Sequence, residues 1–424
     1  MSRGRYRSMD MTPGCSRREF VKSIGAASAV AAGGLVLAGP GFGQTPQPPA
    51  PVETNIGEFQ KVPRTPRSLP GPFPGKVVKV TDTRSVIAEP VAVPAKAPEK
   101  PPGKPEALPA RFDAKVIEEM VARGITTLTG KPMKESFGLL IDPRDVVGIK
   151  VNPVGPPLIN TRPEVVDAVI TWLVDNGIKR SNIVIWDRFD YMLKDAGFTK
   201  ERFPGIGLEG LQTMDEDGNR WRGADGNHVS IDNFDKDAFY FAKGIVGKGV
   251  KGYKDDEFYL NQHVFNGEYS YFGKLLTRKL TRIINVAAYK NTGASISMAT
   301  KNMGYGSVCN TGRLHAPLSL KVNTEVLASP VLRDKLALNI TDGLRAQYDG
   351  GPDKNAQFVY DNHSLYFATD PFALDMLCHQ EITAKRKEMG APVNESPRIT
   401  EYLHYAETLG IGVVSPDKMN VVKV

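Results

Sequence analysis

Lysine and asparagine side chains gather where two predicted strands end, and their chemistry suits the binding of an anion. Such residues accompany the apolar runs at 145–152 and 283–288, and a glycine-rich stretch follows the second run. Lysine ammonium groups and exposed backbone N–H groups suit phosphate or carboxylate. The sequence therefore predicts a small-anion site with the ligand-binding residues Lys150, Asn152, Lys290, Lys301 and Asn302. For Lys150 and Lys301 a structural role stays open, because lysine is rarely buried without a partner.

Acid–base chemistry at this site would need a proton carrier, for which three residues are candidates. Asp187 and Asp342 each follow a predicted strand, and His315 follows the glycine-rich stretch. Histidine titrates near neutral pH and serves as a general acid, a general base or a metal ligand. We expect His315, Asp187 and Asp342 to be catalytic. The alternatives are a surface-loop histidine and, for Asp342, an aspartate that only caps a turn.

Two further aspartates, Asp370 and Asp375, are the predicted metal ligands. Asp375 shares a helix face with Cys378 and His379, three and four residues later, so the three could contribute to a soft metal site. Packing is the alternative role for Cys378. Asp370 also fits the N-cap of that helix, because Pro371 follows it. The sequence leaves the cofactor unknown, with a divalent metal as one option.

Missing motifs exclude several familiar chemistries. The sequence has no Walker lysine loop, no Gly-x-Ser-x-Gly elbow, no His-Glu-x-x-His pair and no Gly-x-Gly-x-x-Gly after its first strand. The acidic run at 215–219 begins like a calcium loop, but Arg220 stands where the turn needs glycine, so we expect a hairpin turn. Only Cys309 and Cys378 lie beyond the first 43 residues, too few for a self-contained iron–sulfur cluster. One disulfide or two buried thiols both stay open.

A βαβ unit is predicted around Lys150. Residues 145–152 form a β-branched run without helical period, which indicates a strand buried on both faces. An amphipathic helix then begins after Thr161 and ends at Gly177, and residues 182–187 predict a second strand. Strand, helix and strand of these lengths imply parallel pairing and a right-handed crossover.

Similar units recur, and they predict an α/β fold with a mostly parallel sheet built from βαβ units. Strand-like runs lie at 283–288, 336–340 and 365–368, and the last leads into a helix. Between residues 190 and 280 the pattern is polar and turn-rich, which predicts an insertion with hairpins. Ligands of open parallel sheets bind beyond the carboxyl ends of the strands, where we expect the candidate residues to meet.

The first 43 residues resemble a twin-arginine export signal. Arg17 and Arg18 precede Phe20 and Lys22, and a mild apolar run of about 15 residues follows, shorter than the roughly 20 that cross a membrane. This segment has six basic and two acidic residues, so most of the net charge of +7 belongs to it, and nucleic acid is disfavoured as a partner. The resemblance implies the Tat translocon as partner, cleavage near Gly43, and a soluble periplasmic protein without a stable transmembrane segment.

Residues 44–110 are predicted to form a proline-rich arm or linker. They contain 16 of the 32 prolines, and proline favours extended segments over a packed core because it fixes φ and lacks a backbone donor. Short strands could form at 76–80 and 85–87 within the arm. We expect the ordered domain to begin near Arg111 and to occupy residues 111–424.

An ordered set of short motifs resembles the DUF362 family over about residues 145–380. In chain order the motifs are Ile149-Lys150-Val151-Asn152, the helix start at Thr161 and Pro163, Ile183 to Asp187, Lys290 with Lys301-Asn302, Thr341-Asp342-Gly343 with Gly350-Gly351-Pro352, and Thr369-Asp370-Pro371 with Ala373 and Asp375. The resemblance implies an α/β fold and this residue set, but no reaction or substrate. Some relatives carry a ferredoxin-like iron–sulfur module, for which this sequence lacks the cysteines.

Two functions are expected from these observations. The first is an exported protein that binds a small phosphate or carboxylate at the strand ends and acts on it, with metal assistance as an option. The second is a non-catalytic binding or assembly factor for an envelope redox complex, in which the proline-rich arm docks an envelope partner. Deleting the arm separates them, because an enzyme should keep its activity and a docking factor should lose its partner.

Overall fold

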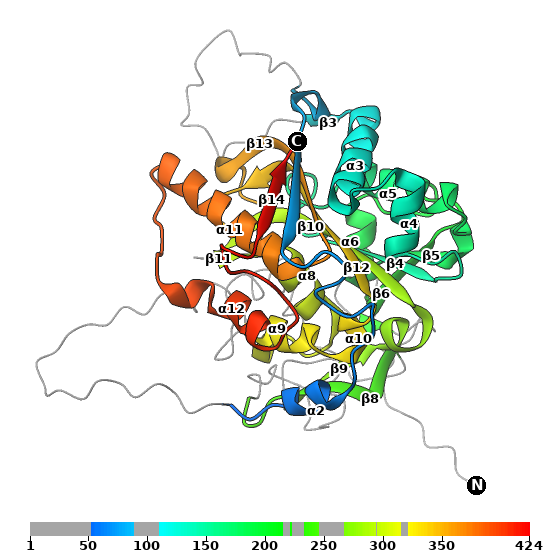
Figure 1. Ribbon diagram of the computed structural model, residues 1–424, viewed down its shortest axis with the longest axis vertical. Helices are drawn as coiled ribbons and strands as arrows, with labels where there is room; N and C mark the ends of the chain where they lie inside the picture. Colours follow the sequence, from blue (N-terminus) through cyan, green and yellow to red (C-terminus); the bar gives the residue numbers. More distant parts are fainter. Residues whose placement is uncertain are drawn as a thin grey trace, which may run out of the picture.

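A computed structural model describes the secondary structure and contacts of most of the chain (Figure 1). The described residues are 52–88, 110–214, 221–222, 233–245, 267–293, 295–314 and 321–424. Three predictions lie outside them: the export signal at 1–43, the hairpin turn at 215–219 and the proton carrier His315. Among the described residues, no helix combines the length and the apolar character that a membrane span requires.

A ten-stranded sheet forms the centre of the fold, in the order β14, β1, β13, β12, β10, β4, β5, β6 and β7, with β11 paired to β10. These strands are β1 (Lys76–Thr81), β4 (Val147–Val151), β5 (Ile183–Phe189), β6 (Gly207–Met214), β7 (Trp221–Arg222), β10 (Arg282–Thr292), β11 (Ser295–Ile296), β12 (Leu336–Gln347), β13 (Val359–Ala368) and β14 (Asn420–Lys423). The run from β12 through β10, β4 and β5 to β6 is parallel, whereas β13 is antiparallel to both its neighbours. The predicted α/β fold with a mostly parallel sheet is confirmed.

Helices cover both faces of this sheet (Figure 1). The first face carries α3 (Ala114–Thr129), α4 (Met133–Leu140) and α5 (Pro163–Asp175). The second face carries α8 (Ala299–Gly304), α9 (Lys321–Leu327), α10 (Pro330–Arg333), α11 (Pro371–Glu388) and α12 (Glu401–Thr408). Because side chains alternate along a strand, Ile183 and Ile185 of β5 join the first core, whereas Val184 and Trp186 join the second.

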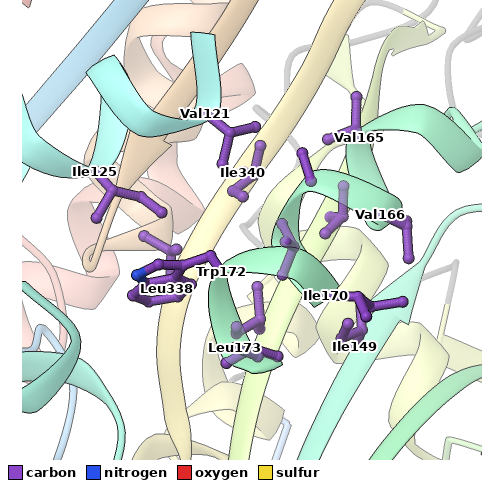
Figure 2. Close-up of a cluster of buried hydrophobic side chains, with 14 of the residues drawn as sticks. Val121, Ile125, Ile149, Val165, Val166, Ile170, Trp172, Leu173, Leu338 and Ile340 are labelled. Atoms are coloured by element: carbon purple, nitrogen blue, oxygen red, sulfur yellow. The ribbon is translucent and has the colours of Figure 1, made fainter. Parts of the chain in front are cut away.

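The predicted βαβ unit around Lys150 consists of β4, α5 and β5. Helix α5 begins with Pro163 at its first turn, and its apolar side packs on the sheet beside α3. Figure 2 shows this packing, with Val166 and Ile170 of α5 pointing toward Ile149 of β4. Burial of such side chains stabilises the unit by roughly 1.5–3 kcal/mol each, and it fixes where the carboxyl ends of β4 and β5 lie.

The proline-rich segment contributes directly to the sheet, although we expected the ordered domain to begin near Arg111. Strand β1 lies between β14 and β13, and Val77, Val78 and Val80 are completely buried. The segment also contains α2 (Ile56–Lys61) and β2 (Val86–Ala88), and β2 pairs with β3 (Ala110–Phe112). The prolines flank these elements without interrupting them, so they exclude no backbone donor from the ladder. Residues 52–88 are therefore part of the fold.

The region expected as an insertion, 190–280, begins with elements of the main sheet. Helix α6 (Asp190–Asp195) leads back to β6, which pairs in parallel with β5. Strand β6 contains glycine because a Cβ at Gly210 would lie 2.3 Å from the backbone nitrogen of Asp190. The end of β6 pairs antiparallel with β7, and β8 (Phe234–Phe241) pairs antiparallel with β9 (Tyr269–Gly273), so antiparallel strand pairs follow the parallel strand β6 in this region.

Candidate functional site

Three buried or partly buried lysines meet at the carboxyl ends of the parallel strands. Lys150 lies in β4, Lys290 in β10, and Lys301 in α8, which follows β10. We call them the lysine cluster. Lys150 and Lys301 both lie near enough to Lys290 to lower its pKa, while Asp187 of β5 and Asp353 raise it. The structure thus brings together side chains from positions 150 to 353 of the chain, as the parallel arrangement predicts.

The ammonium group of Lys150 has no hydrogen left for a ligand. It donates to the backbone oxygen of Val151 at 2.7 Å, to Oδ1 of Asn302 at 2.9 Å, and to the carboxylate of Asp187. An ammonium group carries three hydrogens, and all three are used. Burial lowers the pKa of Lys150, and the Asp187 carboxylate opposes that effect. In this arrangement Lys150 holds Asp187 and Asn302 in place.

A chain of buried amides connects Lys150 to the rest of the sheet. Asn302 donates from Nδ2 to Oδ1 of Asn285 at 2.7 Å, and Asn285 donates in turn to Oδ1 of Asn339 at 3.0 Å. Lys150, Asn285 and Asn339 occupy facing positions on β4, β10 and β12, so they lie side by side on one face. Because each amide is paired, this polar row avoids the cost of burying free hydrogen-bonding groups.

Lys290 keeps one ammonium hydrogen free of the described residues. Its Nζ donates to Oδ1 of Asn152 at 3.1 Å and to the backbone oxygen of Val154 at 3.0 Å. Only 1% of the residue is exposed, and no carboxylate of the described residues forms an ion pair with it. Burial lowers the pKa of Lys290 to about 7. An anion that supplied the third hydrogen-bond acceptor would favour the charged form of this lysine.

Lys301 is the least engaged member of the lysine cluster. Its Nζ lies 5.6 Å from the centre of the Tyr305 ring, a cation–π contact. In the described part of the chain, this amine has no hydrogen-bond acceptor and no carboxylate partner. Burial lowers the pKa of Lys301 to about 8. The side chain is partly exposed, whereas Lys150 and Lys290 are buried. Lys301 is therefore the member with all of its donors available for a ligand.

Three of the aspartates predicted to act in catalysis or metal binding lie at helix N-termini. Asp342 accepts from the backbone nitrogen of Arg162 at 2.7 Å, at the start of α5. Asp375 accepts from the backbone nitrogens of Ala299 and Thr300, both at 2.9 Å, at the start of α8. Carboxylates at helix N-termini satisfy unpaired N–H groups and interact well with the helix dipole. These helix ends are consequently occupied by carboxylates of the protein itself.

Asp370 caps α11 and lies at the opposite edge of the sheet. It accepts from Phe372 and Ala373 in the first turn, and from the backbone nitrogens of Gly75 and Val413. Because β13 runs antiparallel to β12, its carboxyl end faces Asn339, near the start of β12, and not Asp342. The expectation that Asp370 shares a strand-end site with Asp342 does not fit this direction. Burial raises the pKa of Asp370 to about 7, and of Asp342 and Asp375 to about 6.

The two cysteines and the predicted metal ligands are buried in the second face of the sheet. Cys309 and Cys378 are buried thiols that form no disulfide, and burial raises the pKa of Cys309 to about 12. The described residues contain no group of three or more His, Cys, Asp or Glu side chains placed to hold a metal ion. Asp375 bonds to the first turn of α8, and within the described part of the chain Nδ1 of His379 is buried without a hydrogen-bond partner.

Sequence reasoning missed several residues that build the site. Asn285 and Asn339 each interrupt an apolar run with an amide, and that interruption was the available signal. Gly306 belongs to the glycine-rich stretch of the sequence. It lies so close to Lys150 that a Cβ at this position would be 2.6 Å from Cε of the lysine. Arg188, next to Asp187, donates to the hydroxyl of Thr311 and ties the loop after α8 to β5. No short motif marks that contact.

Comparison with known proteins gives one match. Residues 261–380 match the family model of DUF362, a domain of unknown function. No curated protein and no solved structure matches the chain. The resemblance to this domain family is supported for the matched residues, which include Lys290, Lys301 and Asn302, whereas Lys150, Asn152 and Asp187 precede them.

Proposed function

We propose that this DUF362-like protein binds a small anionic ligand, a phosphate or a carboxylate, at the lysine cluster. The observation that carries the proposal is the excess of buried positive charge. Asp187 neutralises Lys150, but no carboxylate of the described residues pairs with Lys290 or Lys301. Burying unpaired charge is costly, and the cost falls when an anion enters.

The members of the site then have distinct tasks. Lys301 and the free hydrogen of Lys290 contact the anion, because only these donors are uncommitted. Asn152 and Val154 fix the position of Lys290. Lys150 holds Asn302, and Asn302 lies next to Lys301 in α8, whose first turn is anchored by Asp375. A ligand would therefore meet the Lys290 amine at a position that is already set, which reduces the entropic cost of binding.

Sulfate titration of the full-length protein tests the proposal. Sulfate keeps its double charge over the neutral pH range, so its affinity reports on the protein. We expect Lys290→Met and Lys301→Met each to weaken sulfate binding by at least about tenfold, the loss of one charged hydrogen bond. Lys335→Met is the matched control, because Lys335 is a partly buried lysine with a lowered pKa that donates to Leu276 and lies before β12 begins. Equal sulfate affinity in all four proteins would refute the proposal.

We further propose that the protein is exported through the Tat translocon to the periplasm. The support is the sequence alone: paired Arg17 and Arg18, then Phe20 and Lys22, then a short apolar run. Replacing both arginines by lysine keeps the charge and should retain the protein in the cytoplasm. Cell fractionation of the two forms decides the matter, since equal periplasmic amounts would contradict the proposal.

A further inference from the structure

The carboxylate of Asp187 has one oxygen that no described residue uses. Its Oδ1 accepts from the ammonium group of Lys150, and the side chain is only 9% exposed. Within the described part of the chain, Oδ2 accepts no hydrogen bond and forms no ion pair. In the other candidate aspartates both carboxylate oxygens accept from the protein, and these are Asp342, Asp370 and Asp375. Asp187 thus retains an acceptor that the other three have already used.

This acceptor lies among the lysines of the proposed anion site. Lys150 donates both to Asp187 and to Asn302 of α8, the helix that carries Lys301. Burial lowers the pKa of Lys290, and Asp187 is one of the nearby carboxylates that oppose this effect. An ionised carboxylate has acceptor lone pairs only, so it attracts an O–H group of a ligand and repels a ligand oxygen without hydrogen. The site therefore combines ammonium donors with one acceptor.

We infer that the lysine cluster binds inorganic phosphate in preference to sulfate, because Oδ2 of Asp187 accepts a hydrogen bond from the phosphate hydroxyl. This inference rests on the proposed anion site, in which Lys290 and Lys301 bind the other oxygens. Inorganic phosphate keeps at least one hydroxyl over the neutral pH range, whereas sulfate has none. A simple carboxylate such as acetate also lacks a hydroxyl. Of the two anion classes proposed for the site, the acceptor thus favours phosphate.

Lys150 allows Asp187 to select the ligand without repelling anions in general. The ion pair offsets the charge of the carboxylate, so the positive charge of Lys290 and Lys301 still attracts an anion. Because all three hydrogens of Lys150 are used by the protein, this amine does not compete for the ligand oxygens. The lysines thus supply the attraction, and the free carboxylate oxygen supplies the choice between anions.

Isothermal titration calorimetry with phosphate, sulfate and acetate tests the inference. The full-length protein is titrated near neutral pH at constant ionic strength, in a buffer without these anions. We expect phosphate to bind at least about tenfold more tightly than sulfate, the gain from one hydrogen bond to a charged group. Charge cannot produce this preference, because phosphate carries no more negative charge than sulfate at this pH. Acetate should bind more weakly than phosphate as well.

Two double variants identify the acceptor. Lys150→Met combined with Asp187→Asn removes the ion pair and keeps the net charge of the site, and an amide can turn its N–H group toward a sulfate oxygen. The ratio of phosphate to sulfate affinity should then fall to about one. Lys79→Met combined with Glu381→Gln removes an ion pair between β1 and α11, outside the site, and should keep the preference. Circular dichroism shows whether each variant folds, and the comparison of anions on the unchanged protein needs no variant.

The outcomes separate this inference from the proposed function. If phosphate, sulfate and acetate bind equally well through Lys290 and Lys301, the inference is wrong and the anion site stands. A preference for phosphate that persists without the Asp187 carboxylate also overturns the inference. If no anion engages the lysine cluster, the inference and the proposed function are both wrong. A preference for phosphate that disappears with the carboxylate supports both.

Discussion

Anion binding at the lysine cluster should weaken steeply as the pH rises, because the two lysines that face the ligand titrate near neutrality. The pKa of Lys290 is about 7 and that of Lys301 about 8. Both pKa values lie below that of a free lysine, so the two amines of the empty site are partly deprotonated near neutral pH. When an anion binds, the two lysines take up protons again, because the anion favours their charged forms. Sulfate therefore binds with proton uptake, and its affinity must fall as protons become scarce.

The size of the effect follows from the two pKa values. Between pH 6 and pH 9 the fraction of protein with both ammonium groups charged falls about a thousandfold, which corresponds to roughly 4 kcal/mol of sulfate binding free energy. In Lys290→Met only Lys301 titrates, so the expected decrease shrinks to about tenfold. In Lys301→Met only Lys290 titrates, so the expected decrease is about a hundredfold.

Isothermal titration calorimetry with sulfate at several pH values measures this dependence. Repeating the titration in buffers of different ionisation enthalpy counts the protons taken up directly. Ionic strength is held constant, since salt alone screens charge. Lys335→Met should follow the unchanged protein at every pH. A sulfate affinity that stays constant from pH 6 to pH 9 would refute the assignment of Lys290 and Lys301 as the groups whose titration controls sulfate binding. A decrease in Lys290→Met as steep as in the unchanged protein would refute it as well.

Four further predictions concern the stability of the fold. Lys150→Met should lower the free energy of unfolding by about 3–5 kcal/mol, because it leaves the Asp187 carboxylate buried and unpaired, and adding Asp187→Asn should recover part of that loss in denaturant titrations. Gly306→Ala places a Cβ 2.6 Å from Cε of Lys150 and should cost about 1–3 kcal/mol, whereas Gly138→Ala, with nothing within 4 Å, should cost nothing. Asp370→Ala should cost about 2–4 kcal/mol by freeing four backbone N–H groups, measured by thermal unfolding. Deleting residues 76–81 should prevent folding, because it removes β1 from between β14 and β13; a cooperative thermal transition in the deletion variant would contradict this prediction.

The parallel centre of the fold could be predicted from the sequence because its signals are local. Buried β-branched runs gave β4 and β5, and Thr161 with Pro163 indicated the start of α5. Parallel neighbours end at the same edge, and this alone predicted that Lys150 and Asp187 would approach one another. The grouping of Lys290 and Lys301 with them followed from the same rule.

What the sequence could not supply was strand direction and the partner of each polar group. An apolar run such as 365–368 looks the same in a parallel and an antiparallel strand, so the placement of Asp370 depended on pairing that only the fold reveals. Likewise, an aspartate at a strand end can bind a metal or cap a distant helix. Asp375 caps α8 from a position more than 70 residues later in the chain, a contact that no local pattern records. Strand β6 was missed because glycines replace its apolar residues where α6 packs closely.

Strand β1 gives the order in which the chain can assemble. It is hydrogen-bonded on one side to β13 and on the other to β14, whose residues 420–423 come more than 300 positions later. During synthesis, the buried valines of β1 must wait unpaired while almost all of the remaining protein is made. Contacts of such long range slow folding, because the loop entropy is lost before the pairing energy is gained. The final sheet therefore closes around one of its earliest strands only after residue 423 has left the ribosome, and until then that strand is a natural client for a chaperone.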